Sequence, residues 1–161
     1  MPLAPATPLG VLANQLRQKT GALFRCCKEY TTYLQELDRD AKALQEKTAK
    51  GETTTQAANV LKETEGMLPI VRKNALKMAD GFLDFWEENR PKIERILNET
   101  PPEDKERHKF IQECGQASRL LNKLLASEDG KNSALEPAVL AMIRAIQIDV
   151  ELFSQGKQLK A

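Results

Sequence analysis

Apolar residues recur through the first third of the chain at alternating spacings of three and four residues. This is the heptad pattern of a helix that packs lengthwise against another helix. Thr7 before Pro8 is a typical helix start, because the hydroxyl can cap the first turn and proline suits its first position. Lys50-Gly51 is a typical end, so a helix is predicted over residues 8–50, roughly 60 Å long at 1.5 Å per residue. The apolar positions are Leu9, Leu12, Leu16, Leu23, Cys27, Tyr30, Leu34, Leu37, Ala41 and Leu44.

A second heptad seam follows, opened by Thr53-Thr54-Thr55-Gln56, whose spacing permits a capping box. Pro69 in its middle removes one backbone hydrogen bond and should bend the helix. The seam keeps its phase across Pro69, so one kinked helix is predicted over residues 53–98. Arg90-Pro91 marks a second kink or a break. The seam consists of Ala57, Leu61, Thr64, Leu68, Val71, Ala75, Met78, Phe82 and Phe85, flanked by Val60, Met67, Ala79, Leu83 and Trp86.

Two shorter helices are predicted beyond residue 100. The run Thr100-Pro101-Pro102-Glu103 offers a capping threonine, prolines in the first turn and a glutamate three residues on, which favours a third helix over residues 101–126. Residues 127–132 have loop composition. A fourth, very apolar helix is predicted over residues 134–158. The fold class is therefore all-α: one domain in which an antiparallel three-helix bundle of long helices is extended by a C-terminal fourth helix.

The fourth helix carries a polar stripe so narrow that it predicts burial on most sides, against the first three helices and beside Phe82, Phe85 and Trp86. Asp149 lies off this stripe, so it should be paired with a lysine or arginine of a neighbouring helix. The stripe consists of Arg144, Gln147, Glu151 and Ser154.

Composition and charge narrow the function classes. The 161 residues carry a net charge of +1, with the two signs mixed along the chain. No broad positive field is therefore available for nucleic acid. The longest apolar run, 138–148, is too short to cross a bilayer and contains Arg144. The first ten residues lack the pattern of a signal peptide. Three cysteines, two of them adjacent, favour a reducing, cytoplasmic setting.

The usual residues of catalysis and metal binding have ordinary explanations here. The single histidine, His108, stands in a charged first turn, where a solvated surface position is expected. Cys26 and Cys27 lie at the edge of the first seam and are expected to pack as small apolar residues. Too few cysteines and histidines exist for a zinc site. No catalytic, cofactor-binding or metal-binding residue is predicted, and the chain is not expected to be an enzyme.

Charged residues decorate the first helix outside its seam, either as an ordinary solvated face or as a flank that docks a protein. Among them is a run that reads Lys19-Thr20-Gly21, then Arg25, Lys28-Glu29, Tyr33 and Glu36. The second helix reads Val60-Leu61-Lys62-Glu63-Thr64 and then Met67-Leu68-Pro69. In this order and at this separation the two stretches resemble the tubulin-binding cofactor A family over residues 12–85. The resemblance is weak over 103–126 and absent over 127–161.

The resemblance implies a non-catalytic helical chaperone that holds β-tubulin after its release from the cytosolic chaperonin and before it pairs with α-tubulin. It implies no nucleotide, metal or other cofactor, and a cytoplasmic, cytoskeleton-associated location in tubulin folding. A monomer is expected, with a homodimer as the alternative. The residues expected to contact the partner are Lys19, Arg25, Lys28, Glu29, Tyr33, Glu36 and Pro69.

Two other function classes fit the same pattern. A coiled-coil scaffold or adaptor would use the heptad seams between chains rather than within one. A membrane-acting bundle would release the helix predicted over 134–158 into lipid, although the expectation here is no membrane binding. The additional helix and the longer second helix could also cover part of the surface that shorter family members use for binding.

Overall fold

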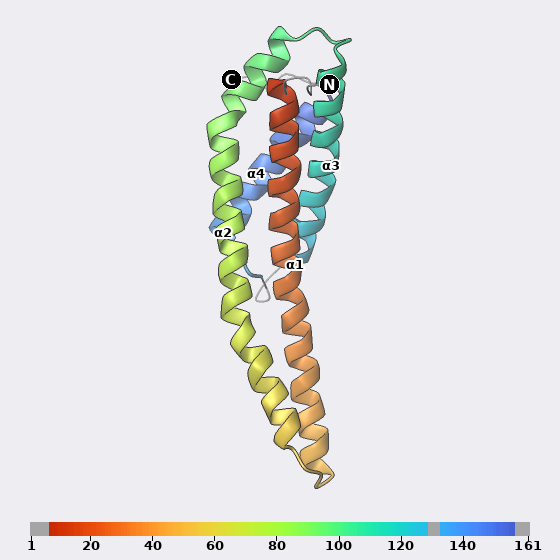
Figure 1. Cartoon of the computed structure of the whole chain (residues 1–161), viewed down its shortest axis with the longest axis vertical. Coiled ribbons are helices and arrows are strands. Elements are labelled where there is room, and N and C mark those ends of the chain that lie inside the picture. The colour runs from red at the N-terminus through yellow and green to blue at the C-terminus, as the bar shows by residue number, and fades with distance from the viewer. Residues whose placement is uncertain (1–6, 129–132, 157–161) are drawn as a thin grey trace, which may run out of the picture.

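Four helices and their short connections make up the computed structural model of the chain, which describes residues 7–128 and 133–156 (Figure 1). The helices are α1 (Pro8–Ala49), α2 (Thr55–Glu99), α3 (Lys105–Ser127) and α4 (Pro137–Ser154). Within these ranges there is no β-strand, and the predicted all-α fold is confirmed. Residues 157 and 158, the last two of the predicted fourth helix, lie outside the described part.

The ends of α1 are those that the sequence predicts. The Thr7 side chain accepts a hydrogen bond from the backbone N–H of Gly10 at 3.0 Å, and Pro8 occupies the first helical position. The helix ends at Ala49, within one residue of the prediction, with Lys50 as its C-cap, and Gly51 follows with a φ of 71°. Glycine adopts this left-handed conformation without a steric penalty, which lets the chain reverse towards α2.

The second helix continues through both of its internal prolines. It runs from Thr55 to Glu99 across Pro69, as predicted, and curves along its length (Figure 1). The break considered at Pro91 does not form, because the turns on both sides are held by packing: Trp86 before it and Ile93 after it are buried. The predicted capping box is also wrong. The helix starts two residues later than expected, and its N-cap residue makes no side-chain cap hydrogen bond.

The third helix, α3, begins four residues beyond its predicted start. Thr100 does not cap α3; its hydroxyl instead donates to the Ile96 carbonyl at 2.6 Å and closes the end of α2. It has an extended backbone, as the residue before a proline usually does. Asp104 caps α3 by accepting from the Arg107 N–H at 3.0 Å. The prediction of a start at residue 101 was wrong because two good capping residues stand close together.

The first three helices form an up-down-up bundle (Figure 1). α1 and α2 are antiparallel, and the Thr64 hydroxyl of α2 donates to Asp40 of α1 at 2.9 Å. α3 runs parallel to α1, so that Thr7 and Glu106 meet at one end, 3.2 Å apart. α3 has 23 residues, against 42 in α1, and therefore covers only about half of it. The remaining parts of α1 and α2 project beyond α3 as a two-helix arm.

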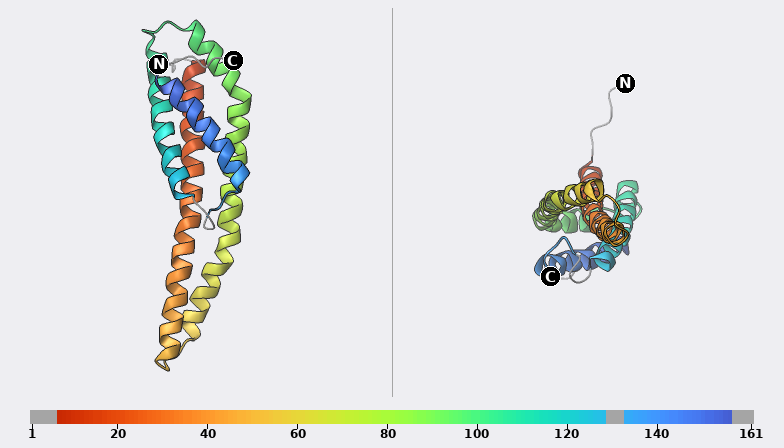
Figure 2. Two further views of the ribbon diagram at one scale, coloured as in Figure 1. Left: turned by 180° about the vertical axis from the view of Figure 1, so that it is seen from behind. Right: turned by 90° about the horizontal axis from the view of Figure 1, so that it is seen from below.

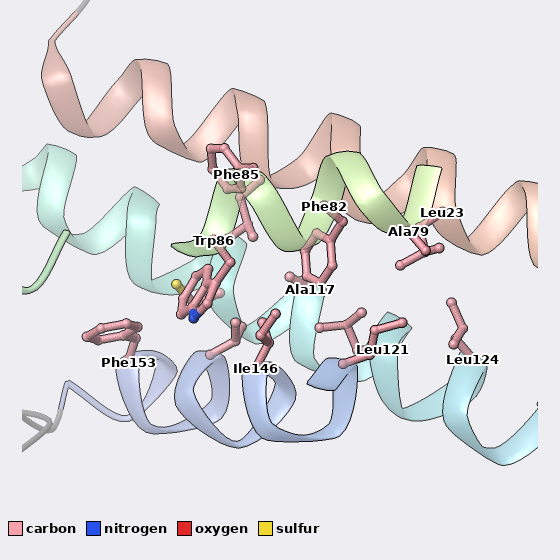
Figure 3. Packing of buried hydrophobic residues seen from close by; sticks show 14 of the residues in the cluster. Leu23, Ala79, Phe82, Phe85, Trp86, Ala117, Leu121, Leu124, Ile146 and Phe153 are labelled. Atoms are coloured by element: carbon pink, nitrogen blue, oxygen red, sulfur yellow. The ribbon is translucent and has the colours of Figure 1, made fainter. Parts of the chain in front are cut away.

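The hydrophobic core lies in the half of the molecule where α3 and α4 are present. Figure 3 shows its side chains meeting between the helices. Trp86 of α2 lies beside Phe153 of α4, with ring centroids 5.8 Å apart and planes tilted by 56°. Tilted aromatic pairs of this kind stabilise beyond their area burial. The largest fully buried apolar side chains are Phe82, Phe110, Phe153, Leu16, Leu23, Ile93, Leu121, Leu124, Ile143, Val71 and Val150.

The fourth helix crosses obliquely over the face formed by α2 and α3 (Figure 2). It packs mainly against α3 and also touches α2. Asp149 has the cationic partner that the sequence requires, because the Arg90 Nε–H of α2 donates to its Oδ2 at 2.9 Å. The prediction that α4 packs back on the bundle, near Trp86, is therefore confirmed.

The prediction that α4 is buried on most sides is wrong. Met142 is 54% exposed and Ile148 is 53% exposed, whereas Gln147 of the supposed solvent stripe is buried. Gln147 Nε2 donates to the Ser118 hydroxyl of α3 at 3.1 Å. Since α4 lies outside the α2–α3 face rather than between helices, only one of its sides turns inward. The buried apolar residues of that side are Ile143, Ile146, Val150 and Phe153.

Candidate protein-binding surface

The two-helix arm is the part of the molecule where an apolar seam stays partly open. Thr31 of α1 and Ser127, the last residue of α3, line the same cavity, which shows that α3 ends at this level. We define the arm as residues 32–70, all of which the structure describes. Within it only Thr64 is buried. The half-buried seam residues of the arm are Leu34, Leu37, Ala41, Leu44, Ala57, Leu61, Met67 and Leu68.

Partial burial of this seam follows from the number of helices around it. In the upper half, α3 covers the side of the α1–α2 pair that the arm leaves open, and Leu16 and Leu23 of the same seam are completely buried. With only α1 and α2 around it, the seam of the arm is buried only in part. The arm therefore exposes to solvent a long apolar strip that is bordered by charged residues. Many protein-binding surfaces have this composition.

Two contacts fix the register in which α1 and α2 run past each other. Asp40 meets Thr64 in the arm. In the body, the Lys19 ammonium lies over the Phe85 ring, 6.0 Å from its centroid. Between these two contacts, antiparallel pairing places residue 36 of α1 opposite residue 68 of α2. The two stretches that carry the family resemblance therefore lie side by side, with Glu36 opposite Leu68 and Tyr33 one turn away, whereas Pro69 is exposed on the outer side of α2.

The seven predicted contact residues do not form one continuous patch. Asp40, Tyr33 and Lys19 are spaced by sevens on the row of α1 that faces α2, and Glu29 and Glu36 occupy the neighbouring row. Lys28 belongs to the opposite edge of α1, where it lines a cavity shared with α3. The side chains of Arg25, Lys28, Glu29 and Pro69 are exposed, and those of Lys19, Tyr33 and Glu36 are partly buried.

The structure thus separates the predicted residues. Lys19, Glu29, Tyr33 and Glu36 lie on the α2 side of α1, the last three around the beginning of the arm, whereas Pro69 is exposed on the outer side of α2. Lys28 lies on the α3 side of α1, above the end of α3. Heptad spacing shows which residues share a row of α1, but only the structure shows which neighbour each row faces.

A cavity of about 220 Å³ separates α1 from the end of α3, lined by Phe24, Cys27, Lys28, Thr31, Lys123 and Leu124 among others. Beside it, the carboxylate of Glu128 is 3% exposed and accepts the Ala134 N–H at 2.9 Å. This bond ties the end of α3 to the segment that leads into α4. The sequence does not predict this hydrogen bond, because residues 127–132 show only the composition of a loop and nothing there marks one glutamate as buried.

The cysteines have the character of core residues rather than nucleophiles. Burial, together with the Glu128 carboxylate, raises the pKa of the Cys27 thiol. Burial also raises the pKa of Cys114, and that of the half-buried Cys26 to a smaller extent. A thiol must ionise to act as a nucleophile or metal ligand. These thiols therefore stay protonated at neutral pH, as expected for packing residues.

Other features of the described residues bear on the candidate chemistry. His108 is exposed, as expected from its charged surroundings. Over residues 7–128 and 133–156 no three His, Cys, Asp or Glu side chains gather as a metal site would require. In the same ranges no helix combines the length and apolar character needed to span a membrane.

The chain was compared with protein-family models, with curated proteins and with solved structures, and none of the three comparisons gave a match.

Proposed function

We propose that this protein binds β-tubulin as a non-catalytic chaperone and that the arm is its main contact surface. The observation that carries the proposal is that the two family-like stretches lie side by side at Tyr33, Glu36 and Leu68. They are far apart in sequence, yet adjacent on the only part of the described bundle that two helices leave open. β-Tubulin is the partner that the resemblance implies, and the two proteins would bind each other in the cytosol.

The chemistry of the arm supports capture of a partly assembled protein. Its half-buried leucines can cover apolar surface on the partner, while the surrounding charges restrict which partners fit. No chemical step or bound nucleotide is needed for such binding. A long, narrow projection can also reach a partner without steric hindrance from the body of the bundle.

The scaffold alternative would require the heptad seams of α1 and α2 to pair between chains. In the upper half these seams are filled within one chain by α1, α2 and α3. The membrane alternative would require α4 to leave the bundle and break the Arg90–Asp149 pair. β-Tubulin binding needs neither rearrangement.

The test is analytical gel filtration of the full chain with β-tubulin released from chaperonin, with and without added GTP or ATP. We expect a one-to-one complex that forms without nucleotide hydrolysis by this chain. Failure to form the complex under any condition, or a strict requirement for hydrolysis by this chain, would overturn the proposal.

Two matched charge variants then locate the surface. Glu29→Lys/Glu36→Lys changes one row at the start of the arm, and we expect it to weaken capture. Lys105→Glu/Lys109→Glu changes two exposed residues at the start of α3, far from the arm, and should bind as the wild type does. Equal binding by both variants would show that the arm is not the contact surface.

A further inference from the structure

The fourth helix is apolar on two opposite sides, and only one of them is used within the bundle. The outward side carries apolar residues at alternating spacings of three and four, which is the seam of a second helix–helix contact. Met142 flanks this seam. We define the outer face of α4 by six apolar residues, of which five are exposed and Leu152 is half-buried against the core: Ala138, Ala141, Met142, Ala145, Ile148 and Leu152.

This face is unusual for the outside of a bundle. Met142 and Ile148 are two of the five large hydrophobic side chains that are strongly exposed among the described residues, and both belong to this one short helix. A helix that is apolar on all sides is normally covered on all sides. Exposed apolar patches of this kind typically mark interaction sites. The three alanines would allow a second helix to approach closely.

The charges at one edge of this face indicate what covers it. Arg144 and Glu151 lie seven residues apart on the same edge, have opposite signs and are both exposed. Arg144 forms no ion pair with any described residue, and the Glu151 carboxylate accepts only a 3.3 Å hydrogen bond from Gln147 within the described part of the chain. When two copies of α4 pack antiparallel, Arg144 of each lies near Glu151 of the other. In a parallel pair, by contrast, the two copies of this edge lie on opposite sides of the contact, so Arg144 and Glu151 would not meet.

We propose that the outer face of α4 binds the same face of a second copy of this chain, antiparallel, about a two-fold axis near Ala145 and Ile148. The two Arg144–Glu151 pairs then lie on either side of the axis, and Ala145 and Ile148 form the centre of the contact. Such an isologous contact closes on itself and stops at a dimer. The proposal does not depend on the identity of the partner bound by the arm.

The size of the contact predicts its strength. With 18 residues, α4 spans only about 27 Å at 1.5 Å per residue. A single pair of such helices buries less than the roughly 800 Å² per partner of a standard interface. The dimer should therefore dissociate in the micromolar range. Because α4 lies on the body of the bundle, both arms stay free, and the dimer would present two of them.

Sedimentation velocity of the full chain over a wide concentration range is the first test. We expect a monomer–dimer equilibrium with a Kd on the order of micromolar, or about −8 kcal/mol. Ile148→Glu should leave only monomer. Ile70→Glu is the matched control, because Ile70 of α2 is also 53% exposed but lies outside α4, and this variant should dimerise as the wild type does.

A charge exchange tests the antiparallel arrangement itself. Arg144→Glu alone and Glu151→Arg alone should each weaken the dimer by about ten-fold, since each places two like charges together. The double variant Arg144→Glu/Glu151→Arg should recover the wild-type affinity. Thermal melting of each variant at low concentration would show that the fold is unchanged.

Three results would overturn the proposal. They are a wild-type chain that stays monomeric at every concentration, a dimer that persists in Ile148→Glu, and a double variant that fails to recover. Flotation with phosphatidylcholine–phosphatidylserine vesicles separates one further occupant. If the wild-type chain is monomeric and binds these vesicles, and the Ile148→Glu variant does not bind them, the outer face of α4 is assigned to lipid instead of a second copy.

Discussion

At the scale of single residues, a few polar groups determine how the helices fit together. Asp149 would be costly to bury alone, and the Arg90 guanidinium, only 2.9 Å away, satisfies it. Gln147 likewise turns inward to Ser118, although its spacing places it on the polar stripe. The sequence predicted that Asp149 needs a cation. It could not predict the inward turn of Gln147, because an amide suits both water and a buried hydroxyl.

The charged residues in the middle of the first helix should affect β-tubulin capture more than stability. Reversing both charges in Arg25→Glu/Lys28→Glu should weaken capture by about ten-fold at low salt, since rim charges steer association. The difference should shrink at high salt, where screening is strong. Binding at several ionic strengths, with circular dichroism as a check on the fold, measures this. Wild-type affinity at low salt would exclude this edge of α1 from the contact.

The buried thiols should make the fold less stable in alkali. Burial raises the pKa of Cys27 and Cys114 in the folded chain, so these thiols ionise only after unfolding. Their contribution is fully present below the unfolded thiol pKa and is lost as pH rises above it. One pH unit above that pKa, each thiol should lower the free energy of unfolding by about 1.4 kcal/mol.

Urea unfolding at a series of pH values measures this effect. Cys114→Ala should be less stable at neutral pH but should lose less stability in alkali than the wild type. Native Cys26 should react with a thiol reagent first, because it alone is half-exposed. An identical pH dependence in the wild type and Cys114→Ala would contradict the assignment.

At the scale of elements, heptad spacing predicted the long helices better than the short ones. α1 ends one residue before the predicted end, and α2 lies within two residues of its predicted bounds. Their seams extend over many turns, so a single position that deviates from the pattern does not change the predicted helix. The start of α3 was missed because Thr100 and Asp104 can each cap a helix, and only packing of the chain decides between them. The sequence predicted α4, but it did not predict how little of the helix is buried in the bundle.

Pro69 should bend α2 without being needed for the fold. Its ring prevents one backbone hydrogen bond, and the helix continues through it. Pro69→Ala should restore that bond and raise the free energy of unfolding by about 1 kcal/mol or more. Urea unfolding measures the gain. If the bend shapes the arm, β-tubulin capture should weaken although stability rises. A less stable Pro69→Ala would contradict this account of α2.

Removal of α4 should damage the bundle. Truncation after Ser127 uncovers Trp86 and the α3 side chains that α4 protects. It removes Ala134, Leu135 and the four buried apolar residues of α4, and each of those four is worth roughly 1.5–3 kcal/mol before entropy. We expect the 1–127 fragment to melt about 10 °C lower or to aggregate. Thermal melting with light scattering measures this. A monomeric fragment with unchanged melting would show that α4 does not support the core.

At the scale of the whole molecule, the protein consists of a packed body and an open arm. The body is closed by α3 and α4, whereas residues 32–70 have only one buried side chain. The sequence gives the length of each helix, and the mismatch between α1 and α3 already implies uncovered turns. It does not show which end of α1 is uncovered, because that depends on the parallel alignment that brings Thr7 to Glu106. The sequence therefore predicted which residues belong to the candidate surface, but not how they are arranged in space.

Hydrogen–deuterium exchange of the full chain, alone and in complex with β-tubulin, tests the central claim most directly. With only two helices and one buried side chain, the free arm should exchange faster than the body. On binding, protection should appear mainly over residues 32–49 and 55–70, with little change in α3. A stable complex whose added protection lies in α3 or α4, with the arm exchanging as in the free chain, would contradict the account.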